Sequence, residues 1–290
     1  MKKFTIEPEF HNMKISLYLK EKGYSGRGIR NVEVYLNGKR VKTTKLVKKN
    51  AKLLVKEKDK EVGIKPIQMN LSVIYEDKNL LIIDKESNLV VHPTTKKTDI
   101  TLANGVIYYL QEQTGKIQPP RFFNRLDMNT TGLIVVAKNA FTQAFLQADK
   151  ERISKHYQAI VKGIVSEDEM TIEIPIGKEG EDLRRKEMSV EEGGQTAKTH
   201  MKVLERFPNE NLTLIELELF TGRTHQIRAH MSLNGHPILG DDLYDGGDLR
   251  AERQMLHAFK LIFTNVDSGE KIKVEAPLPK DFREILNKTK

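Results

Sequence analysis

The chain has 290 residues, of which 38% are hydrophobic and 30% are charged, and it contains no cysteine. This length predicts two unequal domains with a core large enough to need no covalent cross-link. The absence of cysteine excludes disulfides, thiolate zinc sites and cysteine nucleophiles. The sequence starts without the apolar stretch of a signal peptide and has no apolar run long enough to cross a membrane, so we expect a soluble, cytoplasmic protein.

The net charge of +8 is concentrated in the first quarter of the chain. Residues 1–70 carry 18 Lys and Arg against 7 Asp and Glu, whereas the remaining 220 residues are slightly acidic. Such a surplus is typical of a module that binds a polyanion, either nucleic acid or an anionic membrane surface. Because no amphipathic helix with large apolar anchors accompanies the charge, nucleic acid is the preferred partner.

The basic segment contains two predicted helices followed by a small sheet. Apolar residues at helical spacing predict a first helix over residues 13–19, and Ser25 can cap a second, short helix. The Asn37–Gly38 pair between two strand-like runs predicts a tight β-hairpin, and residues 52–55 predict a further strand. This arrangement places four basic side chains where they can grip phosphates, namely Arg27, Arg30, Lys39 and Arg40.

The order of these elements resembles the alpha-L RNA-binding domain, a fold shared with a small-subunit ribosomal protein. The resemblance covers residues 10–58 and implies a small α/β RNA-binding domain over residues 1–62. Residues 63–70, which include Gly63 and Pro66, are predicted to form a linker. Residues 71–290 then form a second, larger domain.

In the larger domain, strand-like apolar runs outnumber helical segments. Strands are predicted at residues 73–75, 80–83, 89–91, 132–138, 157–165, 171–176, 199–204, 212–220, 257–263 and 271–274. Helices are predicted at residues 99–113, 140–152 and 224–233. Many strands with few helices predict an α+β domain with a large mixed, mainly antiparallel sheet.

Several motifs of nucleotide-binding enzymes and hydrolases are absent. The sequence has no P-loop, no dinucleotide-binding glycine fingerprint after a strand and no nucleophile elbow. Its histidine cluster consists of His225, His230 and His236. Residues five apart on a helix point about 140° away from each other, unlike the i,i+4 pair of helical zinc sites. We therefore expect no metal site there.

Two polar segments contain the candidate chemistry. The first, residues 122–132, places Asp127 in a loop before a buried strand. Its Asp, Asn, Thr and Gly residues are ordinary turn formers, so local sequence alone favours a plain turn. The second, residues 221–230, begins a helix whose first turn carries cations, against the preference of the helix dipole. A cation there either has an anionic partner, such as a phosphate or Asp127, or forms a surface salt bridge of little energetic consequence.

Taken together and in order, these segments resemble the RluA-type RNA pseudouridine synthases. The family's Arg-Leu-Asp-x-x-Thr-[Ser/Thr]-Gly core is met by residues 125–132, and its Lys-x-Tyr-x-Ala-x-Val-x-Gly strand by residues 155–163. Its Thr-Gly-Arg-[Thr/Ser]-His-Gln-[Ile/Leu]-Arg segment is met by residues 221–228, and residues 235–241 match the stretch that follows. The resemblance covers about residues 71–286, and an alpha-L domain ahead of the catalytic domain is a usual arrangement in this family.

The resemblance implies that the chain converts specific uridines to pseudouridine in structured RNA, a reaction that needs no cofactor. It assigns Asp127 as the essential carboxylate, Arg228 as its cationic partner and Tyr157 as the residue that stacks on the flipped uracil. Because a paired base must be extruded before it can react, Arg125 would enter the vacated place in the stack. Further contacts with RNA would come from Asn124, Arg223 and His225.

Two positions depart from the family pattern. The early Lys-Pro-x-Gly loop reads Lys85-Glu86-Ser87-Asn88 here, and Asn124 stands where a histidine is common. The first departure concerns the shape of a loop near the site, and the second concerns the contacts of the flipped base. Neither removes a residue that the chemistry requires.

The substrate and two other functions stay open at this point. The domain arrangement favours large-subunit (23S) ribosomal RNA, with transfer RNA as the alternative, and we expect a monomer as is usual in the family. A non-catalytic RNA-binding protein would explain the basic N-terminus but not the presence of Asp127, Tyr157 and Arg228 together. A glycoside hydrolase needs two carboxylates flanking the bond, and the motif offers Asp127 without a partner carboxylate.

Overall fold

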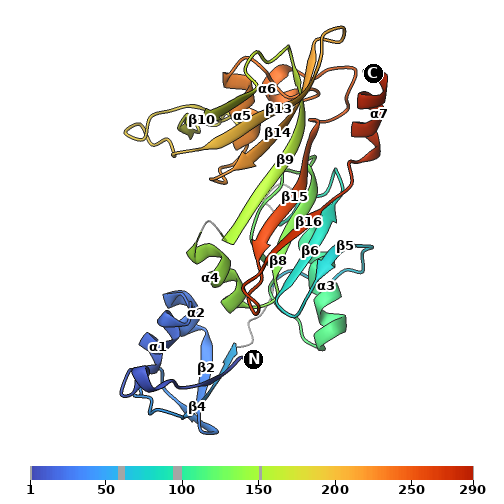
Figure 1. Cartoon of the computed structure of the whole chain (residues 1–290). Helices are drawn as coiled ribbons and strands as arrows, with labels where there is room; N and C mark the ends of the chain where they lie inside the picture. The colour runs from blue at the N-terminus through green and yellow to red at the C-terminus, as the bar shows by residue number, and fades with distance from the viewer. Residues whose placement is uncertain (1, 58–62, 94–99, 150–151, 290) are drawn as a thin grey trace.

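The computed structural model describes residues 2–57, 63–93, 100–149 and 152–289. These residues form a four-stranded sheet at the N-terminal end, a ten-stranded sheet in the larger domain and a two-stranded sheet of β11 (Ile176–Gly177) and β12 (Lys186–Glu187) (Figure 1). Among the strand pairs of the described residues, only β8 and β15 run parallel. The predicted α+β class with a mixed, mainly antiparallel sheet is therefore confirmed.

The N-terminal sheet packs against two helices, as the sequence predicts. Its elements are β1 (Lys2–Thr5), η1 (Pro8–Phe10), α1 (Ile15–Glu21), α2 (Gly26–Arg30), β2 (Val32–Leu36), β3 (Lys39–Val41) and β4 (Lys52–Glu57). The Ser25 hydroxyl caps α2 by accepting the amide of Gly28 at 3.0 Å. Asn37 and Gly38 have φ values of 49° and 82°, the left-handed conformation that an Asn–Gly hairpin requires. Strand β1 was not predicted, because its pairing partner β4 is distant in sequence.

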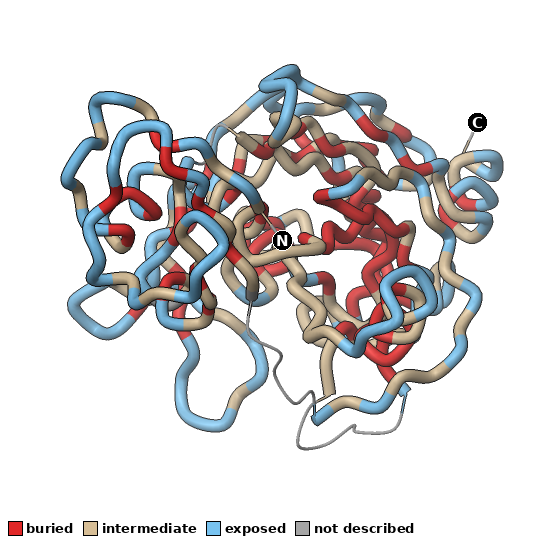
Figure 2. The backbone as a smooth tube through the Cα atoms, turned by 90° about the horizontal axis from the view of Figure 1, so that it is seen from below, coloured by how far each residue is buried: buried red, intermediate tan, exposed pale blue. Residues whose placement is uncertain are grey.

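The large sheet has the strand order β10-β13-β14-β9-β15-β8-β6-β5, with β16 paired to β15 and β7 to β8. Its strands are β5 (Ser72–Glu76), β6 (Leu80–Lys85), β7 (Arg121–Phe122), β8 (Thr131–Ala137), β9 (Ile153–Lys162), β10 (Glu169–Ile172), β13 (Thr199–Phe207), β14 (Leu212–Leu219), β15 (Leu256–Thr264) and β16 (Lys271–Glu275). The helices of this domain are α3 (Leu102–Thr114), α4 (Ala140–Ala148), α5 (Gln226–Leu233), α6 (Asp242–Asp245) and α7 (Lys280–Lys288). Buried stretches of the chain lie in the interior, and exposed stretches follow the outer loops (Figure 2).

One predicted strand is wrong, and three predicted helices are shorter than expected, among them α5, which begins at Gln226 instead of residue 224. Residues 89–91 form no strand, because the carbonyls of Val90 and Val91 accept the first amides of α3, at 2.9 and 3.0 Å. Helix α3 begins at Leu102 behind a capping box of Thr101 and Asn104, and the predicted start at residue 99 lies outside the described residues. Helix α4 ends at Ala148, and residues 150–151 also lie outside the description.

The predicted linker lies against α3. Residues 63–70 contain no helix or strand. The side chain of Asn104 donates to the carbonyl of Lys65 at 2.8 Å, and the amide of Ile67 donates to the carbonyl of Asn104 at 3.2 Å. The domain boundary at residue 62 falls within residues 58–62, which are outside the described residues, so it stays a prediction.

An aromatic contact joins the N-terminal domain to the larger one. The ring centroids of Tyr24 and of Phe141, on α4, lie 5.2 Å apart. The ammonium of Lys2 lies 3.9 Å from the centroid of the Phe141 ring. Phe141 thus packs against the core of the N-terminal domain although it belongs to the larger one.

The centre of the large sheet is the junction of β8 and β15. Strand β15 pairs antiparallel with β9 on one side and parallel with β8 on the other. Gly132, near the start of β8, has φ of 108°, and a Cβ there would lie 2.3 Å from the carbonyl oxygen of Ala258. Only glycine fits this position, since both the conformation and the close approach exclude a side chain. The junction therefore fixes the end of the loop that contains Asp127.

Candidate active site

The loop before β8 presents Asp127 at the edge of the main core. The carbonyl of Asp127 accepts the amide of Thr130 at 3.1 Å, which closes the turn that local sequence predicted. Leu126 is buried in the main hydrophobic cluster, and the strand that follows is buried along its whole length. The Asp127 side chain keeps an exposed fraction of 29%. The carboxylate therefore has a rigid base and an open face.

Two buried cations hold this loop from behind. Lys85, the last residue of β6, donates to three backbone carbonyls, at 2.8 Å to Glu86, 3.1 Å to Leu89 and 2.9 Å to Met128. Arg253 donates to the carbonyl of Asn129 at 3.2 Å and forms a bidentate pair with Asp281 of α7, at 2.6 and 2.9 Å. Burial lowers the pKa of Lys85 to about 7, although the charge of Asp127 opposes the shift. Neither side chain is predicted to belong to the site, and the sequence signal for Lys85 is its place in the early family loop.

Replacement of Lys85 by Met is expected to lower the free energy of unfolding by about 3 kcal/mol at pH 7, because three partly buried backbone carbonyls lose their donor. The wild-type protein should also gain stability relative to this variant between pH 7 and 10. In that range the unfolded state keeps the lysine proton and the folded state releases it, since the pKa of about 7 lies below the ordinary value of 10.5.

Urea unfolding at pH 7 and pH 9 measures both effects. Lys271→Met, which changes an exposed lysine of β16, serves as the matched control and should stay within about 0.5 kcal/mol of the wild type. Equal stability of the Lys85→Met variant and the wild type at pH 7 would contradict the anchoring role.

Arg228 on α5 is the ionic partner of Asp127. Its Nη1 donates to Oδ2 of Asp127 at 3.0 Å, while its Nε and Nη2 donate to Asp241 at 2.7 and 2.8 Å. Arg228 is 6% exposed, and Asp241 is fully buried. Burial opposes the charge of Arg228, but the hydrogen bonds and charges of Asp241 and Asp127 outweigh burial and raise the pKa of Arg228. The guanidinium therefore places a permanent positive charge beside Asp127.

His225 precedes α5 in a strained backbone conformation. Its φ of 55° lies in the left-handed region, which is uncommon for a residue other than glycine and is found at functional sites. The ring Nε2 lies 3.9 Å from Oδ2 of Asp127, and Nδ1 lies 3.4 Å from the hydroxyl of Tyr244. Burial lowers the pKa of His225, so the ring is neutral at pH 7 and does not compete with Arg228 for the carboxylate.

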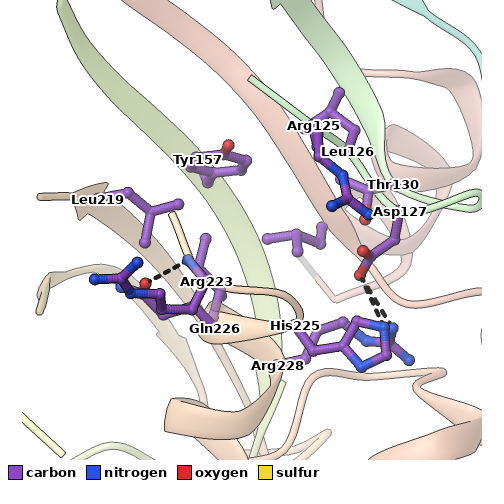
Figure 3. A pocket seen from close by; sticks show the side chains of 12 residues that line it. Arg125, Leu126, Asp127, Thr130, Tyr157, Leu219, Arg223, His225, Gln226 and Arg228 are labelled. Atoms are coloured by element: carbon purple, nitrogen blue, oxygen red, sulfur yellow. Dashed lines mark hydrogen bonds and ion pairs between the residues drawn. The ribbon is translucent and has the colours of Figure 1, made fainter. Parts of the chain in front are cut away.

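Tyr157 on β9 faces the same cleft (Figure 3). It is 4% exposed, and burial together with the charge of Asp127 raises the pKa of its hydroxyl well above the ordinary value. Tyr157 is therefore a neutral phenol at physiological pH, able to stack and to donate a hydrogen bond. Leu219, Ile227 and Leu256 supply apolar walls beside it.

Asn124 ties the approach to the Asp127 loop onto β8. Its side-chain amide donates to the carbonyl of Leu133 at 3.0 Å and accepts the amide of Val135 at 2.8 Å. Each end of the amide group thus makes one hydrogen bond with the backbone of β8. The contact of Asn124 with RNA stays a prediction.

Arg125 and Arg223 line the cleft on different segments (Figure 3). Arg125 is exposed, whereas the Nε of Arg223 donates to the carbonyl of Thr196 at 3.0 Å. Gln226, which sequence analysis did not select, organises the entry to α5. Its side-chain oxygen accepts the Thr221 hydroxyl at 2.7 Å and the Arg223 amide at 3.0 Å. Its place in the matched Thr-Gly-Arg-Thr-His-Gln segment was the available signal.

The basic residues predicted in the N-terminal domain lie away from this cleft. Lys39 and Arg40 are exposed on β3, and Arg40 pairs with Glu33 at 2.6 Å. Arg30 is exposed at the end of α2, and Arg27 belongs to the same helix although its side chain lies outside the description. Figure 1 shows this domain at the opposite end of the molecule from α5 and α6.

The histidines of the sequence cluster have separate partners. His230 bonds the Thr199 hydroxyl at 2.9 Å and the Ile174 carbonyl at 3.0 Å, and His236 bonds the Lys162 carbonyl at 3.0 Å. Within the described ranges, no three His, Cys, Asp or Glu side chains are grouped so that they could hold a metal ion. The same ranges contain no helix with the length and apolarity that a membrane span requires.

The fold and the cleft define an enzyme site in which a carboxylate, a buried guanidinium and a neutral phenol face one opening. The family described as RNA pseudouridylate synthase matches residues 79–233. An uncharacterized RNA pseudouridine synthase of Bacillus subtilis, YhcT, is 37% identical over 87% of this chain and 84% of its own length. Ribosomal large subunit pseudouridine synthase D of Pseudomonas aeruginosa is 39% identical over 76% of this chain and 72% of its own length.

Solved structures agree with these relatives. The human protein RNA Pseudouridylate Synthase Domain Containing 4 superimposes with a TM-score of 0.61 and 25% identity, covering 75% of this chain and 92% of that structure. The human protein RNA Pseudouridylate Synthase Domain Containing 1 superimposes with a TM-score of 0.56 and 26% identity. This match covers 76% of this chain and 94% of that structure. The chain belongs to the RluA-type family of RNA pseudouridine synthases. It is therefore an isomerase that forms pseudouridine in RNA.

Proposed function

We propose that this enzyme converts uridine to pseudouridine in large-subunit ribosomal RNA, with Asp127 as the reacting carboxylate. The observation that carries the role of Asp127 is its 3.0 Å ion pair with the buried Arg228 in a cleft shared with Tyr157. The substrate is supported by relatives from Pseudomonas aeruginosa and Neisseria meningitidis, 39% and 35% identical, that are named ribosomal large subunit pseudouridine synthase D.

The chemistry proposed for the cleft needs an ionised carboxylate. The reaction breaks the bond between N1 of uracil and C1′ of the ribose, rotates the base and joins its C5 to C1′. C5 then loses its proton and N1 takes one up, so the product is an isomer of the substrate. A carboxylate acts as a nucleophile or base only in its ionised form, and Arg228 places a positive charge 3.0 Å from this one. Tyr157, as a neutral phenol, stacks on the base and holds it during the rotation.

The depth of the site supports the proposal that the target uridine is extruded from its helix. Tyr157 is buried, so a base stacked within an RNA helix cannot reach it without leaving the helix. Arg125 is exposed at the same cleft. Its planar guanidinium can occupy the vacated place by stacking on the neighbouring bases.

The N-terminal domain contributes to binding through phosphate contacts. Replacement of both Lys39 and Arg40 by Ala is expected to lower the slope of log affinity against log salt by about 1.5, because two fewer counterions are released. Filter binding between about 50 and 200 mM salt measures the slope. Lys280→Ala with Lys288→Ala, on α7 at the other end of the molecule, is the control of equal charge change. An unchanged slope in the Lys39 and Arg40 variant would contradict the prediction.

The experiment that tests the function is tritium release from RNA labelled at C5 of uridine. Unmodified ribosomal RNA and transfer RNA are supplied separately to the wild-type enzyme and to Asp127→Ala. We expect release from ribosomal RNA that the substitution abolishes.

Release from transfer RNA alone would overturn the proposed substrate but not the reaction. Release by the Asp127→Ala variant at the wild-type rate would overturn the role of the aspartate. No release from either RNA would favour a non-catalytic RNA-binding protein.

A further inference from the structure

Asp241 is a fully buried carboxylate directly behind the active site. It precedes α6, and its Oδ1 accepts the amides of Leu243 and Tyr244, each at 3.2 Å. The same carboxylate binds Arg228 through two hydrogen bonds, at 2.7 and 2.8 Å. Asp241 thus caps a helix and holds the cation of the site at the same time.

The two hydrogen bonds to Asp241 determine how Arg228 meets Asp127. A guanidinium is planar and rigid, so fixing its Nε and Nη2 edge sets the plane and direction of its remaining nitrogen. That nitrogen, Nη1, points to Oδ2 of Asp127 at 3.0 Å. Without Asp241, the Nε and Nη2 edge of Arg228 could turn to Asp127. It would then form a bidentate pair that occupies both carboxylate oxygens of Asp127. The observed geometry commits Arg228 to one hydrogen bond with Asp127.

Asp241 itself is held by the backbone around it. Gly240 has φ of 76°, and a Cβ there would lie 2.2 Å from the carbonyl oxygen of Arg253, so the chain approaches closely at this point. The amide of Asp241 donates to the carbonyl of Ile238 at 3.1 Å. Tyr244, one turn along α6, places its ring centroid 5.3 Å from the guanidinium carbon of Arg228. At the start of α6, Asp241 therefore holds one edge of the Arg228 guanidinium, and Tyr244 covers one of its faces.

We propose that Asp241 is a positioning residue for catalysis, which acts by orienting Arg228 so that Asp127 receives a single hydrogen bond and its positive charge. Asp241 reaches the chemistry only through Arg228. The proposal rests on the proposed function, since it takes Asp127 to be the reacting carboxylate.

Two substitutions separate orientation of Arg228 from capping of α6. Asp241→Asn and Asp241→Ser both keep a side-chain oxygen that can accept the amides of Leu243 and Tyr244, because Asn and Ser are good helix caps. Both remove the negative charge from Arg228. The matched control is Asp242→Asn at the next position, whose carboxylate is 86% exposed and lies 4.0 Å from Arg228.

The test is the rate of tritium release from ribosomal RNA, with kcat and KM measured separately and kcat expressed per folded molecule. Displacement of a positioned group by about 1 Å can cost about 100-fold in rate, so we expect kcat to fall about 100-fold in both Asp241 variants. KM should change by less than about threefold, because Asp241 is fully buried and so lies out of reach of the RNA. Asp242→Asn should keep the wild-type kcat.

A double-mutant cycle with Arg228→Lys tests whether Asp241 acts through Arg228. Lysine cannot reproduce the bidentate edge, so adding Asp241→Asn to Arg228→Lys should cost no further activity. A wild-type kcat in either Asp241 variant, or effects that multiply in the double variant, would overturn the proposal. If neither Asp241→Asn nor Asp241→Ser folds, the proposal is also overturned, because Asp241 is then required for folding and not for the orientation of Arg228. An inactive wild-type enzyme on every RNA would instead refute the proposed function.

Discussion

Asp127→Asn is expected to abolish pseudouridine formation, with a loss of at least about 10⁴-fold in kcat. The amide has nearly the shape of the carboxylate and can still accept the hydrogen bond from Nη1 of Arg228, now 3.0 Å from Oδ2. It cannot act as a nucleophile or a base, because it carries no negative charge. The substitution therefore removes the chemistry and leaves the cleft in place.

Single-turnover tritium release with excess enzyme measures this loss, and gel shift measures RNA binding in parallel. Binding by Asp127→Asn should equal or exceed that of the wild type, since one negative charge near the RNA is removed. Asp242→Asn removes an equivalent charge from an exposed position close to the site and should leave the rate unchanged. Residual activity within tenfold of the wild type would show that another group performs the reaction.

Arg228→Met is expected to lower the free energy of unfolding by about 3–5 kcal/mol as well as to remove activity. Arg228 supplies two of the hydrogen bonds of Asp241, which is fully buried. Methionine fills much of the volume of arginine but leaves the carboxylate of Asp241 as an uncompensated charge in the interior. The cost comes mainly from that isolated charge rather than from the lost ion pair itself.

Urea unfolding of a double variant tests this cause. Arg228→Met combined with Asp241→Asn removes both charges and should be more stable than Arg228→Met alone. Arg283→Met, on the exposed side of α7, is the control for loss of an arginine. A change below about 1 kcal/mol in Arg228→Met would show that water reaches Asp241.

The sequence predicts the elements whose signals are local. Ser25 at a helix start and the Asn37–Gly38 pair act over a few residues, and both have the predicted structure. The long apolar runs of the large sheet are likewise visible without any partner. Strand β1 depends on pairing with β4, so no local pattern marks it. Residues 89–91 have the composition of a strand, yet the start of α3 takes their carbonyls.

The residues of the candidate site also fall into two groups, those that sequence motifs reveal and those that they do not. Motif order selects Asp127, Tyr157 and Arg228, which lie in one cleft although Asp127 and Arg228 are 101 positions apart. The residues that orient them are harder to find, because their roles depend on backbone geometry. Lys85 acts on carbonyls, and Asp241 combines a helix cap with a guanidinium contact. Neither role has a spacing that a single sequence reveals.

The central position of β15 has a consequence for synthesis of the enzyme. This strand separates β8 from β9, so Asp127 and Tyr157 belong to two halves of the sheet that only β15 (Leu256–Thr264) joins. In chain order β15 follows every residue of the cleft except Leu256, which belongs to it. Without β15, the edge of β9 and the Thr131–Gly132 end of β8 have no strand partner, and unpaired edges are templates for aggregation. We therefore expect the two sides of the cleft to come together only once β15 is made, and a growing chain that lacks β15 to aggregate more readily.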